Sequence, residues 1–197
     1  MSFDKNKYQI VRKAISIELA EFIFNYFFLK KEAVKYMYEN NVVHESSTLG
    51  TWKDPQVPNV YSHYADFVME TLLIKVMPIM KKETGLNLIP TYSYARIYEK
   101  GSILAKHKDR PSCEISTTLN LGGDLWPIYL EGIKINLTPG DMLVYSGCDL
   151  EHCRNEFIGT ICAQVFLHYN SLEGPFKDTN LYDKRPLLGL PAFVKNK

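Results

Sequence analysis

Hydrophobic positions in the first half of the chain recur at the spacing of a helix. Ser16 can cap a first helix, with Glu18 in its first turn, and the apolar positions that follow are Ile17, Ala20, Phe24, Phe27 and Phe28. A second pattern predicts another helix, which contains Pro78 and ends at Gly85. Its apolar face comprises Tyr61, Tyr64, Ala65, Val68, Leu72 and Val76. We interpret both helices as packing elements.

The second half changes to short runs that are typical of strands. These predicted strands are residues 92–98, 115–121, 128–130, 133–137, 142–145 and 161–169. Turn signals separate them, at Gly101, Gly122-Gly123, Glu131-Gly132, Pro139-Gly140 and Ser146-Gly147. Helices followed by closely spaced strands predict an α+β fold with an antiparallel sandwich or barrel rather than a βαβ repeat.

The length of 197 residues suits a single domain. We expect helical support over residues 1–90, a barrel core over 91–170 and an irregular tail over 171–197 that wraps the surface or seals an edge strand. A loop rich in Ser, Thr, Gly and Pro, residues 45–58, separates the two helices and is long enough to act as an active-site flap.

Composition narrows the function classes. Hydrophobic residues make up 46% and charged residues 23%, as in globular domains. The net charge of +1 provides no strong positive electrostatic field that would attract nucleic acid or an anionic membrane. The apolar stretches are too short to span a bilayer, and the N-terminus does not resemble a secretory signal. We therefore predict a cytoplasmic protein whose four cysteines are free thiols.

Three residues form the strongest candidate for chemistry. On an extended segment, His107 and Asp109 project to the same face, so an imidazole and a carboxylate can converge on one ion. His152, which follows a later strand, can supply a third ligand. Two histidines and one carboxylate form the facial set that holds Fe(II) and leaves coordination positions open.

The order of these residues resembles the 2-oxoglutarate- and Fe(II)-dependent oxygenases, in particular their prolyl 4-hydroxylase-like branch. The motif runs from Tyr98-x-x-Gly101-x-x-Leu104-x-x-His107-x-Asp109, through residues 117–121 and Pro139-Gly140-Asp141, to His152. The resemblance covers residues 90–170 and implies a double-stranded β-helix, a jelly-roll or cupin-like barrel. It also implies that His107, Asp109 and His152 bind iron, with 2-oxoglutarate and O2 as cosubstrates.

One feature of that branch is missing. The basic residue that usually holds the distal carboxylate of 2-oxoglutarate, on the last barrel strand, is replaced by Ile161 and Cys162. Arg154 is our first candidate for this role, because it lies two positions after His152 on the same face of an extended segment. Arg96 and Tyr98 rank second. Leu104 also stands where the family often has Tyr.

Further residues have weaker roles. Arg110 is a candidate for binding substrate, although it could equally pair with a loop carboxylate such as Glu114. Trp126 could stack on a substrate at the barrel mouth, with packing as the alternative. On the last strand, the apolar set that starts at Ile161 is expected to face the core, which leaves Gln164 and His168 facing outward or towards a helix.

The sequence therefore predicts a dioxygenase that hydroxylates an unactivated C–H bond of an amino-acid or peptidyl substrate. The resemblance alone favours proline. One alternative is a metal-binding or scaffold protein that kept the barrel and lost 2-oxoglutarate turnover, as the replacement at Ile161 and Cys162 would allow. Another is a non-oxidative cupin-like metal enzyme, which should have further His or Glu ligands.

Overall fold

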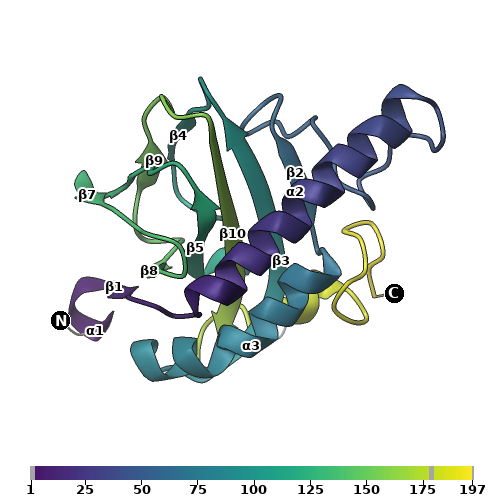
Figure 1. Cartoon of the computed structure of the whole chain (residues 1–197). Coiled ribbons are helices and arrows are strands. Elements are labelled where there is room, and N and C mark those ends of the chain that lie inside the picture. The colour runs from purple at the N-terminus through teal and green to yellow at the C-terminus, as the bar shows by residue number, and fades with distance from the viewer. Residues whose placement is uncertain (1–2, 178–179, 197) are drawn as a thin grey trace.

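Two antiparallel sheets and two long helices make up the protein, which a computed structural model describes for residues 3–177 and 180–196 (Figure 1). The helices are α1 (Phe3–Asn6), α2 (Ile17–Glu39) and α3 (Phe67–Thr84), with 3-10 turns η1 (Pro111–Cys113) and η2 (Leu181–Lys184). The strands are β1 (Tyr8–Val11), β2 (Tyr61–Tyr64), β3 (Leu88–Glu99), β4 (Leu104–His107), β5 (Ile115–Gly123), β6 (Ile128–Leu130), β7 (Ile133–Ile135), β8 (Met142–Ser146), β9 (His152–Arg154) and β10 (Ile161–Ser171).

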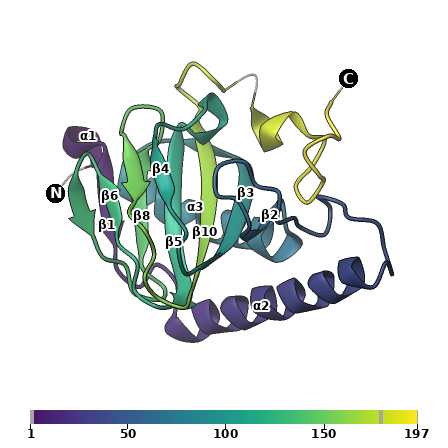
Figure 2. The ribbon, with the colours of Figure 1, turned by 90° about the horizontal axis from the view of Figure 1, so that it is seen from above.

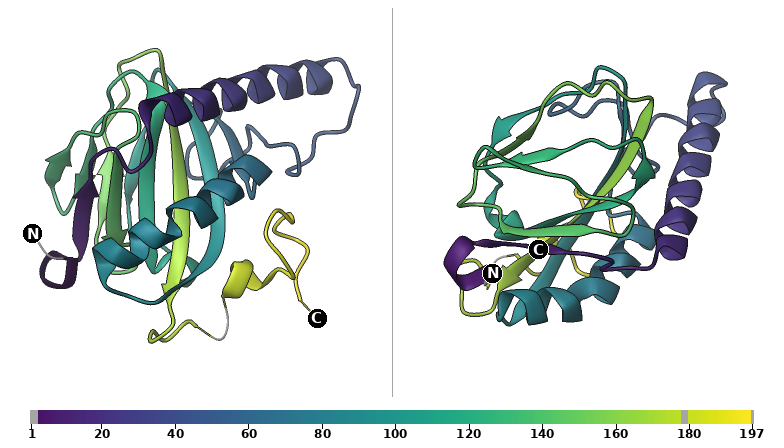
Figure 3. Two further views of the ribbon diagram at one scale, coloured as in Figure 1. Left: turned by 60° about the horizontal axis from the view of Figure 1, so that its bottom comes forward. Right: turned by 60° about the vertical axis from the view of Figure 1, so that its left-hand side comes forward.

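The strands form a two-sheet barrel. The larger sheet has the order β1-β8-β5-β10-β3-β2 and the smaller one the order β4-β9-β6-β7, with antiparallel pairing throughout. Figure 3 shows the small sheet facing the large one across the barrel interior. The chain is thus an α+β protein with a double-stranded β-helix, as predicted.

Both long helices lie against the outer face of the large sheet (Figures 2 and 3). Alternate residues of β10, namely Ala163, Val165 and Leu167, join the apolar core beneath the helices. The other set, including Phe166 and His168, points into the barrel and lines a pocket there. The expectation that Gln164 and His168 face outward or towards a helix was wrong, because this sheet is buried on both faces.

The first predicted helix is confirmed, but its buried face is rotated. Ser16 caps α2 by accepting a hydrogen bond from the Leu19 amide at 3.2 Å. Ile17 and Phe28 are exposed, and the buried residues are Ala20, Ile23, Phe27, Lys31 and Val34. Lys31 is tolerated on this face because its amine pairs with Glu99 at the end of β3, at 2.6 Å.

The second predicted helix begins later than its apolar pattern indicates. Asp66 caps α3 by accepting from the amides of Val68 and Met69, and Gly85 ends it in a left-handed conformation, as predicted. Tyr61 and Tyr64 instead belong to β2, which pairs with β3. Their spacing of three residues, which also suits one turn of a helix, accounts for the wrong prediction.

All six predicted strands are present, although the stretch 133–137 shortens to β7. The short strands β1, β2, β4 and β9 were not among the predicted runs. The four cysteines are unpaired. None of the helices in the described ranges is long and apolar enough to cross a membrane.

Candidate metal centre

The two candidate histidines are cross-strand neighbours in the small sheet. His107 ends β4 and His152 begins β9, and the antiparallel register pairs them directly. Asp109 lies two residues beyond the end of β4, where its backbone amide donates to the carbonyl oxygen of Gly147 at 2.9 Å. Asp109 therefore reaches the histidines from a tethered loop rather than from the strand itself.

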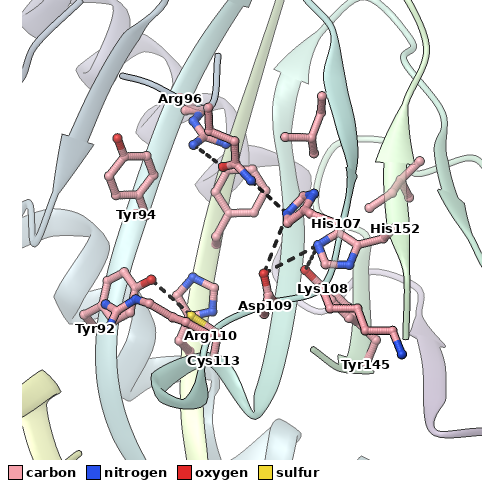
Figure 4. A pocket seen from close by; sticks show the side chains of 15 residues that line it. Tyr92, Tyr94, Arg96, His107, Lys108, Asp109, Arg110, Cys113, Tyr145 and His152 are labelled. Atoms are coloured by element: carbon pink, nitrogen blue, oxygen red, sulfur yellow. Dashed lines mark hydrogen bonds and ion pairs between the residues drawn. The ribbon is translucent and has the colours of Figure 1, made fainter. Parts of the chain in front are cut away.

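The three side chains converge as the motif predicts (Figure 4). Asp109 Oδ1 lies 3.8 Å from Nε2 of His107 and 3.6 Å from Nε2 of His152. One ligand atom from each residue falls within 4.8 Å of the other two, a spacing that can hold a metal ion. Burial lowers the pKa of His152 below its usual value, which keeps its imidazole neutral.

Hydrogen bonds of the other ring nitrogens orient both imidazoles. Nδ1 of His107 lies 2.8 Å from the carbonyl oxygen of Ala105, and Nδ1 of His152 lies 3.1 Å from that of Leu150. A carbonyl oxygen only accepts, so in the neutral tautomer that binds a metal each Nδ1 carries the proton and each Nε2 offers a lone pair. Two nitrogen lone pairs and a carboxylate oxygen thus face one another without a proton to share, an arrangement that a cation stabilises.

Neighbouring side chains meet these nitrogens with donors. The amide nitrogen of Gln56, from the loop that we predicted to act as a flap, lies 2.9 Å from Nε2 of His107. The Tyr145 hydroxyl lies 3.4 Å from Nε2 of His152. Sequence reasoning missed both residues, because neither has a fixed spacing from the histidines.

The second oxygen of Asp109 has its own support. The Ser116 hydroxyl donates to Asp109 Oδ2 at 2.9 Å. Gly147 provides the space, since a Cβ on this residue would lie 2.4 Å from Asp109 Oδ2. The sequence marked Gly147 only as part of a turn.

The histidines and Asp109 open onto a pocket of about 310 Å³. Its far wall belongs to β3 and β10 and is aromatic and basic (Figure 4). The lining residues opposite the metal ligands include Tyr92, Tyr94, Arg96, Phe166 and His168.

Arg154 lies deep in the barrel rather than on the pocket wall. It is 1% exposed and shares β9 with His152, as predicted. Its guanidinium donates to the carbonyl oxygen of Trp126 and, at 3.4 Å, to the Thr118 hydroxyl, while Nε has no hydrogen-bond partner in the part of the chain that the structure describes. Burial lowers its pKa, and no carboxylate of the described residues forms an ion pair with it. A buried cation without an anion is costly.

The second-ranked candidates have partners already. Arg96 lines the pocket, and it pairs with Asp54 at 2.7 Å and donates to Gln56 at 2.6 Å. Its third contact is with the Tyr98 hydroxyl at 3.3 Å. Tyr98 is fully buried against Trp126, at 4.7 Å between ring centroids.

The two candidate substrate residues differ in position. Arg110 lines the pocket, but it forms a two-pronged ion pair with Asp183 of the C-terminal tail, at 2.9 and 3.0 Å, instead of pairing with Glu114. Trp126 is 5% exposed and packs in a core cluster with Phe157, away from the described pocket lining. The pairing of Arg110 with the tail joins residues far apart in sequence, so no local pattern revealed it.

Comparisons with known proteins bear on the fold. The chain matches no protein-family model and no curated protein sequence. Solved structures are similar to it: EctD from S. alaskensis with 2-oxoglutarate and 5-hydroxyectoine has 16% identity and a TM-score of 0.62, over 100% of this chain and 85% of that one. A viral collagen prolyl hydroxylase from Paramecium Bursaria Chlorella virus-1, in its 2OG complex, has 10% identity and a TM-score of 0.59, over 86% and 98%.

A Pseudomonas putida prolyl-4-hydroxylase is similar over 86% of this chain and 95% of its own, with 11% identity and a TM-score of 0.57. The similar structures differ in the molecules that their names mention, but they share one architecture. The protein therefore has the fold of the 2-oxoglutarate- and Fe(II)-dependent oxygenases, and its His107, Asp109 and His152 form a candidate metal triad.

Proposed function

We propose that the protein is an Fe(II)- and 2-oxoglutarate-dependent dioxygenase that hydroxylates an unactivated C–H bond of an amino-acid or peptidyl substrate. The convergence of His107, Asp109 and His152 carries this proposal. Both Nε2 atoms are held as lone-pair donors before any ion arrives, and a facial set of this kind leaves positions open for a chelating cosubstrate and O2. When bound, iron and 2-oxoglutarate supply the oxidising chemistry, and the protein supplies orientation.

Arg154 is the residue that we propose for the distal carboxylate of 2-oxoglutarate. It follows His152 by two residues on β9 and lies deeper in the barrel than the pocket wall, so a short dicarboxylate bound beside His152 would extend inward from the pocket to reach it. Its unpartnered Nε and lack of a carboxylate partner leave a buried positive charge for the ligand to compensate. Arg96 is less suited to the role, because Asp54 already neutralises it.

The substrate is proposed to occupy the aromatic side of the pocket. Tyr92, Tyr94 and Phe166 provide apolar contact area opposite the triad, and Gln56 adds an amide at the edge. The amino-acid or peptidyl class is supported by the likeness to prolyl hydroxylases, which share this architecture.

An anaerobic titration tests the function. The metal-free protein is titrated with Fe(II) and then with 2-oxoglutarate, and the visible charge-transfer band of the chelate is recorded. We expect a saturable band that is absent in His152→Ala, while Asp149→Ala, a change of an exposed carboxylate near β9, retains it. Iron binding without the band would contradict the proposal and favour the metal-binding protein that lost 2-oxoglutarate turnover.

The anchor has a separate test. Arg154→Met keeps most of the side-chain volume and removes the charge, and we expect iron to bind normally while 2-oxoglutarate binds more weakly by about 2–5 kcal/mol, the cost of losing one partner of a buried charge pair. Arg96→Met is the matched variant, since its guanidinium is already paired. If Arg96→Met and not Arg154→Met weakens 2-oxoglutarate, the anchor is Arg96.

A further inference from the structure

A second group of metal-ligating side chains lies beside the triad and shares one residue with it. Asp109, Cys113 and His168 each offer one ligand atom, and these atoms lie within 4.8 Å of one another. Cys113 comes from η1 and His168 from β10, so the group joins the loop after β4 to the large sheet. All three residues line the pocket, which gives an ion from solvent a path to them.

We propose that this group is a second metal site, which binds a thiophilic divalent cation such as Zn²⁺ through Cys113 Sγ, a nitrogen of His168 and the carboxylate of Asp109. Sulfur, imidazole and carboxylate are the ligands that Zn²⁺ takes in proteins. Three such ligands occupy three corners of a tetrahedron and leave the fourth open towards the pocket. Fe(II) at the first site takes no sulfur ligand, so the two sites differ in the metal they favour.

The carboxylate of Asp109 is placed to serve both sites. Oδ1 faces the Nε2 atoms of His107 and His152, at 3.8 and 3.6 Å. Oδ2 lies on the other side, 2.9 Å from the Ser116 hydroxyl, which in turn lies 2.9 Å from Nδ1 of His168. One carboxylate can therefore offer Oδ1 to an ion at the first site and Oδ2 to an ion at the second.

The remaining ligands have few competing partners. Nε2 of His168 has no hydrogen-bond partner among residues 3–177 and 180–196, and His168 borders the pocket. The thiol of Cys113 has one side-chain hydrogen-bond partner among the described residues, the Tyr92 hydroxyl at 3.1 Å. Burial lowers the pKa of His168 to about 4, so its imidazole is neutral and able to bind metal at neutral pH.

Binding changes the protonation of the cysteine. Burial raises the pKa of the Cys113 thiol, so the metal-free group is Cys–SH. A divalent cation replaces that proton: the S–H bond breaks, the S–metal bond forms, and one H⁺ passes to the buffer for each ion bound. No oxidant or reductant takes part.

Co²⁺ is the probe, because its bond to a thiolate gives a near-ultraviolet charge-transfer band that nitrogen and oxygen ligands do not produce. The metal-free protein is titrated with Co²⁺ alone. We expect two equivalents to bind, with the thiolate band and the release of one proton accompanying one of them. Cys113→Ser and His168→Gln should each bind one equivalent, and Cys113→Ser should lose the band entirely.

Cys162→Ser is the matched control, since Cys162 is also buried in the barrel but belongs to neither ligand group. It should keep the band. His107→Ala should keep the band and lose the other equivalent, so failure of the iron site and failure of the second site are read separately. Absence of the band in the unmodified protein, or its persistence in Cys113→Ser, would overturn the second site.

Discussion

The two faces of the large sheet are built from the same strands and have opposite compositions. Towards the helices, β3 and β10 present Ala95, Ile97, Val165 and Leu167, all fully buried and apolar. Towards the barrel, the intervening positions are polar or aromatic, and they include Arg96, Gln164 and His168. The outer face is therefore expected to provide stability, and the inner face to provide the pocket and its chemistry.

This division has a physical cause. Polar groups can be buried on the inner face because other strands supply partners, as when the Thr118 hydroxyl donates to Gln164 at 3.1 Å. The backbone groups of a helix are already hydrogen-bonded within the helix, so a helix contacts the sheet mainly through its side chains. The sheet face beneath the helices therefore consists of apolar residues. A change on one face should alter stability with little effect on ligands, and a change on the other should do the reverse.

The largest effect on stability without an effect on metal binding is expected at Phe27. This α2 residue is fully buried against the outer face, with its ring 5.2 Å from that of Tyr61. Phe27→Ala should lower the free energy of unfolding by about 3–5 kcal/mol, through lost burial and a cavity, and leave Fe(II) affinity unchanged. Phe28→Ala, on the exposed side of the helix, is the control for chemical denaturation. Weaker metal binding in Phe27→Ala would break the comparison.

The inner face should make stability depend on pH. Burial lowers the pKa of His168 to about 4, and in the unfolded chain it is about 6.5. Between pH 6.5 and pH 4 the imidazole is protonated in the unfolded state but remains neutral in the folded state. The folded state is therefore most stable above pH 6.5, and this contribution to its stability is lost as the pH falls towards 4. The loss amounts to about 3 kcal/mol at most.

Denaturation of the metal-free protein between pH 4 and 7 measures this effect. His168→Gln should flatten the profile, and the slope that remains should come in part from His152, whose pKa burial also lowers. Identical slopes in the two proteins would show that His168 does not titrate differently on unfolding.

The smallest effect distinguishes two neighbours on β5. Ser116→Ala removes the hydroxyl that contacts Asp109 Oδ2, and metal affinity should fall about 10–100-fold, as for other groups that orient a ligand. Thr117→Val changes the next residue, whose side chain points to the helices and whose hydroxyl has no hydrogen-bond partner among the described residues. Calorimetric titration with Fe(II) should show no change for Thr117→Val, and equal losses in both variants would contradict the division between faces.

Local patterns predicted the longer strands, and the order of the motif predicted that His107, Asp109 and His152 lie together. Turn residues divide the second half of the chain into units, and His107, Asp109 and His152 follow a recognisable order. Tyr61 and Tyr64 misled, because aromatic residues at this spacing suit a helix as well as the short strand that they form. The prediction for the polar face of β10 was wrong for another reason. Alternation shows that a strand has two faces, but it does not show that both faces are buried.

Contacts between distant segments could not be predicted. Asp183 in the tail holds Arg110, and Gln56 in the loop meets His107, across separations of 73 and 51 residues. Such pairs depend on how the tail and loop fold back over the barrel. The candidate site was therefore predictable in its ligands, whereas the partners that surround those ligands required the structure.

The direct pairing of His107 with His152 has a mechanical consequence. Their strands share two paired positions, Leu104 with Arg154 and His107 with His152, with an irregularity between them. An ion bound by both histidines cross-links the two strands at this short pairing. It thereby helps to offset the entropic cost of holding together the two ends of the long chain segment between them. Metal should therefore slow amide hydrogen exchange in β4 and β9 more than in β10, and the small sheet becomes a part of the molecule whose rigidity is set by its ligand.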